Sequence, residues 1–169
     1  MIISMFIPLV FLFFLLVIFI LLVYGGPYVP TKEKVIKKMI RLSGIKKNET
    51  AVDLGSGDGR IVFRLAEKGI KTYGYEINPL LVLLSRMTIR KKGIGDKAFI
   101  YMKDFWKVNL SRFDVVYIFG INYIMGDLEK KLKKELKPGS RVVTHTFGFP
   151  SWKSERKEGK VYLYKVRGK

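Results

Sequence analysis

The sequence predicts an α/β domain with a doubly wound, mostly parallel sheet, preceded by one apolar helix. From residue 32 onward, short apolar segments alternate with amphipathic segments of about ten residues, which is the pattern of strands and helices in parallel α/β sheets. A glycine-rich turn joins the first strand to the following helix. Ahead of this domain, 19 of the first 24 residues are Leu, Ile, Phe or Val.

Residues 1–24 are predicted to form a transmembrane anchor. Residues 2–24 carry no charge, and as a helix they would measure about 34 Å against about 30 Å of bilayer hydrocarbon. A secretory signal is the competing interpretation, but its basic start, shorter apolar run and small-residue cleavage site are not evident. Lysines follow the run and no positive side chain precedes it, so we expect a single-pass membrane protein with its folded domain on the cytoplasmic side.

The remaining chain is long enough for one core but not for two. Residues 25–31 are expected to form a linker that ends in the segment PYVPT, and residues 32–169 to form one domain. The first elements follow from periodicity and caps. They are a helix capped by Thr31 through about residue 42, a strand over 51–54, a helix over 60–68, a strand over 71–76 and a helix over 79–92.

The second half of the domain continues the alternation. Residues 113–119 are nearly all apolar, which indicates a central strand that is buried on both faces. The other elements are strands over 98–102 and 141–146, a helix over 125–136 and a last strand over 161–166 that could be antiparallel. Ligands of such sheets bind beyond the carboxyl ends of the strands, so the site is predicted at the ends of the first four strands.

The segment DLGSGDGR, residues 53–60, lies where the first strand turns into a helix. Alternate glycines permit a tight turn and a close approach of the backbone to a ligand. The dinucleotide fingerprint fails because Arg60 stands where it needs Gly or Ala, and no Walker A lysine follows. An acidic residue before the first glycine, Asp53, suits a ligand that bears an ammonium group. Glu76 ends the second strand, where a carboxylate can accept hydrogen bonds from both hydroxyls of a ribose.

Composition excludes several chemistries. The chain has no cysteine and one histidine, so Cys-ligated zinc, iron–sulfur clusters, thiol nucleophiles and multi-His metal sites are excluded, and no metal is expected. The single histidine, His145, ends the fifth strand and could be a general base, although a lone histidine is more often structural.

With these residues in place, the sequence resembles the class I S-adenosylmethionine-dependent methyltransferases, which have a Rossmann-like sheet. A narrower resemblance is to a lysine-methylating family that includes archaeal broad-specificity protein-lysine methyltransferases and the mitochondrial enzymes that act on the adenine nucleotide translocase and the ATP synthase c-subunit. The chain differs at residues 146–150, TFGFP, where mitochondrial members carry an Arg before Phe-Pro-Phe-Pro. The segments that carry the resemblance are PYVPT (27–31), DLGSGDGR (53–60), GYEINP (74–79), KDFWKV (103–108), KLKKELKPGSRVV (131–143) and FPSW (149–152).

The resemblance implies S-adenosyl-L-methionine as cofactor and assigns site residues. The glycine loop would pack the methionine part, Glu76 would hold the ribose, and Asp104 would meet the adenine amino group. Tyr28 and Trp152 are candidates for the channel that receives the acceptor. The implied cofactor-binding residues are Asp53, Leu54, Gly55, Ser56, Gly57, Gly59, Glu76, Ile77, Asn78, Asp104 and Phe105.

A net charge of +18 leaves the partner open. It could attract nucleic acid, place the domain against anionic lipid, or reflect a lysine-rich proteome. We expect a membrane-anchored methyltransferase that acts on lysine side chains of protein substrates, which could include a membrane protein. The alternatives are a lipid or small hydrophobic acceptor at the membrane, an RNA acceptor, or a cofactor-binding module without turnover.

Overall fold

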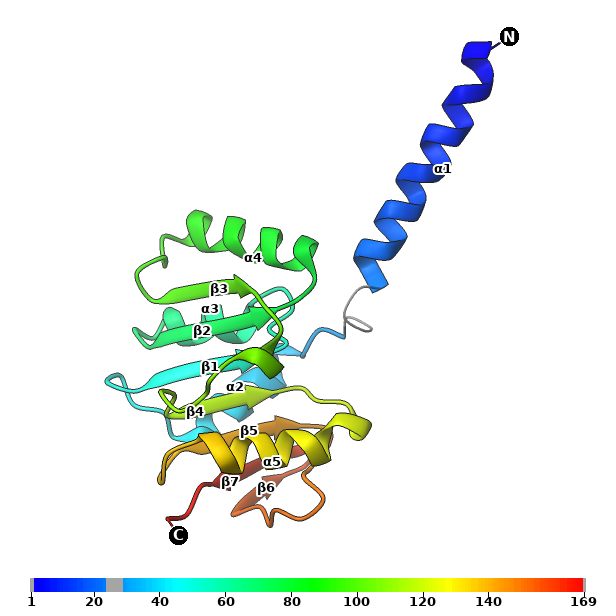
Figure 1. Cartoon of the computed structure of the whole chain (residues 1–169). Helices are drawn as coiled ribbons and strands as arrows, with labels where there is room; N and C mark the ends of the chain where they lie inside the picture. Colours follow the sequence, from blue (N-terminus) through cyan, green and yellow to red (C-terminus); the bar gives the residue numbers. More distant parts are fainter. Residues whose placement is uncertain (1, 24–28, 169) are drawn as a thin grey trace.

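The computed structural model describes residues 2–23 and 29–168, which form a seven-stranded sheet covered by helices (Figure 1). The strand order is β3-β2-β1-β4-β5-β7-β6. The first five strands are parallel, β7 runs antiparallel to β5, and β6 runs antiparallel to β7. The strands are β1 Thr50–Leu54, β2 Lys71–Glu76, β3 Ala98–Met102, β4 Val115–Ile118, β5 Arg141–His145, β6 Arg156–Glu158 and β7 Val161–Lys165.

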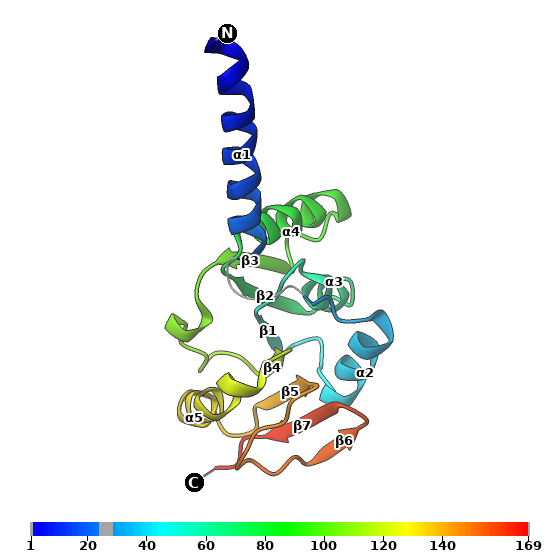
Figure 2. The ribbon, with the colours of Figure 1, turned by 90° about the vertical axis from the view of Figure 1, so that its right-hand side faces the viewer.

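Helices cover both faces of the sheet, as Figure 2 shows from the side. Side chains of α2 and α3 pack with β1, β4 and β5 on one face, where α4 also packs against α3 and β3. On the other face α5 packs against β4 and β5. The helices are α1 Ile2–Val23, α2 Glu33–Ser43, α3 Arg60–Ala66, α4 Pro79–Lys92 and α5 Met125–Glu135, with short 3₁₀ turns η1 Phe105–Lys107 and η2 Asn122–Ile124.

The predicted doubly wound, mostly parallel sheet is confirmed. All four residues of β4 are buried, because the strand lies between β1 and β5 with helices on both faces. The last strand is antiparallel, as the sequence allowed. The short strand β6 was not predicted, since Arg156–Glu158 consists of three charged residues with no apolar alternation.

Thr31 does not cap α2, contrary to the prediction. The N-cap is Lys32, which makes no side-chain cap hydrogen bond, and its backbone carbonyl accepts from Val35 and Ile36. Thr31 is instead buried, and its carbonyl accepts a hydrogen bond of 2.8 Å from Nη1 of Arg60. Tertiary contact with α3 therefore decides the role of this residue.

The N-terminal helix α1 projects away from the sheet and contacts α4 near its end (Figures 1 and 2). Among the helices in residues 2–23 and 29–168, none has both the length and the apolar character needed to span a bilayer, and the predicted transmembrane anchor is therefore not confirmed.

Candidate active site

A cavity of about 590 Å³ opens beyond the carboxyl ends of β1, β2 and β4. This is the point where the strand order reverses between β1 and β4, and it is where parallel sheets bind ligands. Loops after the first four strands line the cavity, together with residues 29–31 that precede α2. The predicted position of the site is thus where the structure places a pocket.

The glycine loop runs from Gly55 to Gly59, and its residues 55–58 line this cavity. Its start is fixed to β2, because the N–H groups of Gly55 and Ser56 both donate to the carbonyl of Tyr75, at 2.9 and 3.1 Å. At its end, Gly59 has a φ of +83°, and a Cβ there would lie 2.6 Å from the ring of Phe63. A side chain at position 59 would therefore both strain the backbone and force the Phe63 ring to shift.

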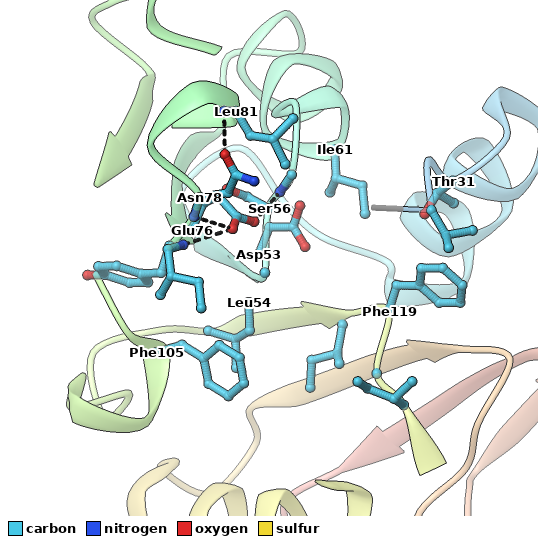
Figure 3. Close-up of a pocket in the computed structure, with 18 of the residues that line it drawn as sticks. Thr31, Asp53, Leu54, Ser56, Ile61, Glu76, Asn78, Leu81, Phe105 and Phe119 are labelled. Carbon is cyan, nitrogen blue, oxygen red and sulfur yellow. Dashed lines mark hydrogen bonds between the residues drawn. The ribbon is translucent and has the colours of Figure 1, made fainter. Parts of the chain in front are cut away.

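The Glu76 carboxylate organises the backbone around the cavity, as the dashed lines in Figure 3 show. Its Oε2 accepts from the N–H of Gly57 at 2.9 Å. Its Oε1 accepts from the N–H groups of Ile77 and Asn78 at 2.8 and 2.9 Å. Each carboxylate oxygen has two lone pairs, so Oε2 can accept a further hydrogen bond from a ligand hydroxyl.

Asp53 is a buried carboxylate, 4% exposed, that lines the same cavity. Burial raises the pKa of this carboxyl well above its ordinary value, and the nearby charges of Glu76 and Asp58 raise it further. Among the described residues it has no hydrogen-bond or ion-pair partner. A buried carboxylate of this kind is stabilised by a cationic ligand.

All the other predicted cofactor residues except Gly59 also line the cavity, and they fall into polar and apolar groups. Asn78 caps α4 through its Oδ1, and Asp104 caps η1 by accepting from the N–H of Trp106 at 3.0 Å. The other carboxylate oxygen of Asp104, Oδ2, accepts no hydrogen bond from the described residues and can accept one from an adenine amino group. Leu54 and Phe105 form apolar walls below Asp53 and Glu76 in Figure 3.

Of the two predicted acceptor-channel residues, the structure describes only Trp152. Tyr28 lies outside the described residues. Trp152 is not among the residues that line the cavity. Its ring lies 5.5 Å from that of Phe149 and 5.3 Å from that of Tyr164, so Trp152 packs in an aromatic cluster, and its role in the acceptor channel stays a prediction.

The structure adds wall residues that the sequence reasoning did not assign. The segment Val29, Pro30 and Thr31 lines the cavity although it precedes the sheet in sequence. Arg60 holds it there, because its guanidinium bonds both the carbonyl of Thr31 and, at 2.6 and 2.9 Å, the carboxylate of Asp58. Pro27 and Pro30 stand directly before the predicted domain start at residue 32, and this position is the signal that could have indicated a wall at residues 29–31. Further walls that the sequence did not indicate come from Ile121, Phe119 and Phe147.

His145 does not line the cavity. Its ring lies against that of Phe119, tilted by 34° with the ring centroids 5.0 Å apart, and burial followed by the charge of Lys160 lowers the pKa of the imidazole. The imidazole supports a wall residue, which is the structural role that the sequence favoured over general-base catalysis.

The residues present fit S-adenosyl-L-methionine, the cofactor implied by the resemblance. The buried Asp53 carboxylate matches the methionyl ammonium, and Gly55 and Gly57, which line the cavity, let a ligand approach the backbone closely. Glu76 offers an acceptor for ribose hydroxyls, and Asp104 offers one for the adenine amino group.

The profile of the ANTKMT methyltransferase domain matches residues 53–156, from the glycine loop to β6. The chain belongs to the ANTKMT methyltransferase domain family. The matched residues include all the residues that line the cavity except those of the segment 29–31.

Curated relatives of this family member are named as lysine methyltransferases. The human ATP synthase c-subunit lysine N-methyltransferase is 41% identical over 133 residues, which are 79% of this chain and 57% of the relative. The protein-lysine N-methyltransferase of Saccharolobus islandicus (strain REY15A) is 38% identical over 128 residues, 75% of this chain and 80% of the relative. The chain thus spans little more than half the length of the human relative and most of the archaeal one.

Among solved structures, an RNA methyltransferase from Salinibacter ruber in complex with S-adenosyl-L-homocysteine superposes with a TM-score of 0.79 at 32% identity. The match covers 83% of this chain and 95% of that one. A MtNAS mutant in complex with S-adenosylmethionine superposes at 0.63 and 17% identity, which shows a common fold. The ANTKMT-family chain therefore has the class I Rossmann-like methyltransferase fold.

Proposed function

We propose that this chain is an S-adenosyl-L-methionine-dependent protein-lysine N-methyltransferase. The observation that carries the proposal is the set of relatives at 38–43% identity that are named lysine N-methyltransferases, together with a family match that spans the cavity. The geometry of the cavity supports the same interpretation, because it offers separate acceptors for the methionyl ammonium, the ribose hydroxyls and the adenine amino group.

The residues of the chain bind and orient the cofactor, which supplies an electrophilic methyl group on a sulfonium. Asp53 would hold the methionyl ammonium and Glu76 the ribose. The three backbone hydrogen bonds of Glu76 fix its carboxylate in advance, which reduces the entropy lost when the cofactor binds. Transfer to an amine is an in-line displacement, so alignment of donor and acceptor is the main demand on the protein.

The acceptor lysine must reach the methyl group as a neutral amine. Deprotonating a free lysine at pH 7 costs roughly 4.6 kcal/mol, from a reference pKa near 10.4. An apolar, aromatic wall lowers that cost because desolvation disfavours the ammonium form. The cavity has such a wall, to which Phe105, Phe119 and Phe147 contribute aromatic rings.

RNA is the second candidate acceptor. The structure from Salinibacter ruber is named as an RNA methyltransferase, and this chain matches 95% of it. The net charge of +18 would also favour RNA. A lipid or small hydrophobic acceptor is a third outcome that the same experiment detects.

The test is to incubate the purified full chain with methyl-labelled cofactor and with protein, RNA and lipid fractions of its host. We expect label in protein that survives nuclease and solvent extraction, with methyllysine found by mass spectrometry. Glu76→Ala should abolish the signal, whereas Glu67→Ala, on the exposed Arg64–Lys92 ion-pair cluster, should not. Label that follows RNA or lipid would reject the lysine proposal.

We also propose that α1 attaches the protein to a membrane with the catalytic domain on the cytoplasmic side. Support comes from its composition, since Ile2–Val23 contains no charged residue, and from its exposed side chains, such as Phe11 at 62% and Phe13 at 68%. Basic residues follow at Lys32 and Lys34, which favours the cytoplasmic side.

This attachment is tested with membranes from cells that express the full chain. We expect the protein to stay with the membranes after alkaline carbonate washing, and added protease to digest the domain in inside-out vesicles but not in right-side-out ones. Recovery in the carbonate supernatant would contradict the attachment, and digestion in right-side-out vesicles would contradict the orientation.

A further inference from the structure

Helix α4 has a second apolar surface that the fold does not use. Its inner stripe, Val82, Ser85 and Ile89, is buried against α3 and β3. Its outer side exposes Leu83 at 56%, Leu84 at 46% and Met87 at 59%. These outer residues stand at spacings of one, three and four, so they form one continuous face of the helix.

The neighbouring sheet edge extends this face. Strand β3 is an edge strand of the sheet, and among the described residues no strand pairs with its outer side. Tyr101 on β3 is 42% exposed and lines a shallow groove together with Leu83 and Met87 of α4. We call Leu83, Leu84, Met87 and Tyr101 the α4 apolar surface. Large apolar side chains that are exposed next to one another are typical of interaction sites.

Cations border the α4 apolar surface. Arg90 and Lys91 follow Met87 within about one helical turn and are exposed. Neither has an ion-pair partner in the part of the chain that the structure describes, whereas Lys92 pairs with Glu67 at 2.7 Å. Large apolar side chains bordered by free cations are the pattern of a helix that lies in the interface of an anionic bilayer.

The position of α4 agrees with this pattern. The end of α1 contacts α4, and both views show α4 and β3 at the end of the domain from which α1 departs, with the two helix axes crosswise (Figures 1 and 2). A helix that enters a membrane beside α4 would leave α4 lying along the membrane surface.

We infer that the α4 apolar surface rests on an anionic lipid bilayer, with Arg90 and Lys91 against the headgroups. The inference rests on the membrane attachment proposed above and specifies which face of the domain meets the lipid. Leu81, on the inner side of the same helix, lines the cavity. The docked domain would therefore hold its cavity about one helix diameter, roughly 10–12 Å, from the bilayer, and its acceptor lysines would be those close to a membrane surface.

The experiment exploits the absence of cysteine in the chain. Single-cysteine variants of the full chain, Leu84→Cys and Met87→Cys, carry an environment-sensitive fluorophore after labelling. Lys134→Cys, on an exposed position of α5 that covers the other face of the sheet, is the matched control. Each variant is reconstituted into vesicles of phosphatidylcholine alone or with about 30% phosphatidylglycerol, which sets a negative surface potential, and nitroxide-labelled lipids serve as quenchers.

We expect a blue shift and quenching at positions 84 and 87 in the anionic vesicles, weaker in neutral ones, and neither effect at position 134. Arg90→Gln with Lys91→Gln should reduce the quenching at position 84 at least twofold. Co-sedimentation of the chain with vesicles separates this inference from the proposed attachment by α1.

If the chain sediments while positions 84 and 87 stay in water, this inference is overturned and the attachment by α1 stands. If the chain does not sediment, the inference and the attachment both fail. Two results together would show that a second copy of the chain covers the α4 apolar surface: a blue shift of the fluorophore at position 84 or 87 without lipid, and a doubled mass of the protein in detergent. They would also overturn the inference.

Discussion

At the scale of single residues, Glu76 combines a structural and a ligand-binding role. Its carboxylate holds three backbone N–H groups, and the same group is the proposed ribose acceptor. Glu76→Gln should therefore raise the cofactor Kd by about tenfold or more, because an amide N–H₂ facing the N–H of Gly57 replaces an acceptor with a donor. Isothermal titration calorimetry measures this, and an unchanged Kd would contradict the ribose assignment.

Substitution of Asp53 should stabilise the fold but weaken cofactor binding. Its folded-state pKa lies above the unfolded value near 3.9, so its ionisation costs free energy in the folded protein. The free energy of unfolding contributed by this group is greatest below about pH 4 and falls as pH rises through the folded pKa. Asp53→Asn removes that cost and should stabilise the cofactor-free protein by about 1–2 kcal/mol at pH 8.

The same substitution should weaken cofactor binding, because the ammonium group loses its counter-charge. Urea unfolding between pH 4 and pH 8 should show the stability difference shrinking toward pH 4. A difference that does not change with pH would mean that Asp53 does not titrate between the two states as its burial requires.

At the scale of elements, the glycine loop and α3 fit each other through Gly59. Gly59→Ala should lower the free energy of unfolding by about 2–4 kcal/mol, since it adds left-handed strain and a Cβ at 2.6 Å from Phe63. Gly69→Ala is the matched control, because Gly69 has a φ of +79° but nothing within 4 Å of a Cβ. It should cost about 1–2 kcal/mol. Equal losses in urea titrations would show that packing against Phe63 has no role.

Arg60 joins two elements that are distant in sequence, the glycine loop and the segment before α2. Arg60→Gln frees the Thr31 carbonyl and the Asp58 carboxylate from this guanidinium. We expect the cofactor Kd to rise about three- to tenfold, the equivalent of roughly one hydrogen bond to a charged group.

Arg64→Gln on the same helix serves as the control, because Arg64 pairs only with exposed Glu33 and Glu67 among the described residues. Its Kd should stay within about a factor of two of the parent value, since exposed ion pairs contribute little. If the two variants bind alike, the link between residue 31 and the loop does not contribute to binding.

At the scale of the whole molecule, a net charge of +18 leaves many more cations than acidic groups that could pair with them. Self-repulsion destabilises a compact state, and salt screens it over about 10 Å at 0.1 M. The urea midpoint should therefore rise when salt increases from about 0.01 to 0.2 M. A midpoint that falls would mean that attractive surface pairs outweigh the net repulsion.

The sequence by itself determined the alternation of strands and helices, because burial on one or both faces leaves a periodicity that can be read from apolar residues. It also determined the acidic and glycine positions of the cavity, because backbone turns and ligand charge restrict which residues can stand there. Only the tertiary structure decided that residues 29–31 form a wall, that Trp152 packs away from the cavity, and that Thr31 does not cap α2. Those outcomes depend on contacts between segments distant in sequence, such as Arg60 with Thr31 and Trp152 with Tyr164, and no local pattern records them.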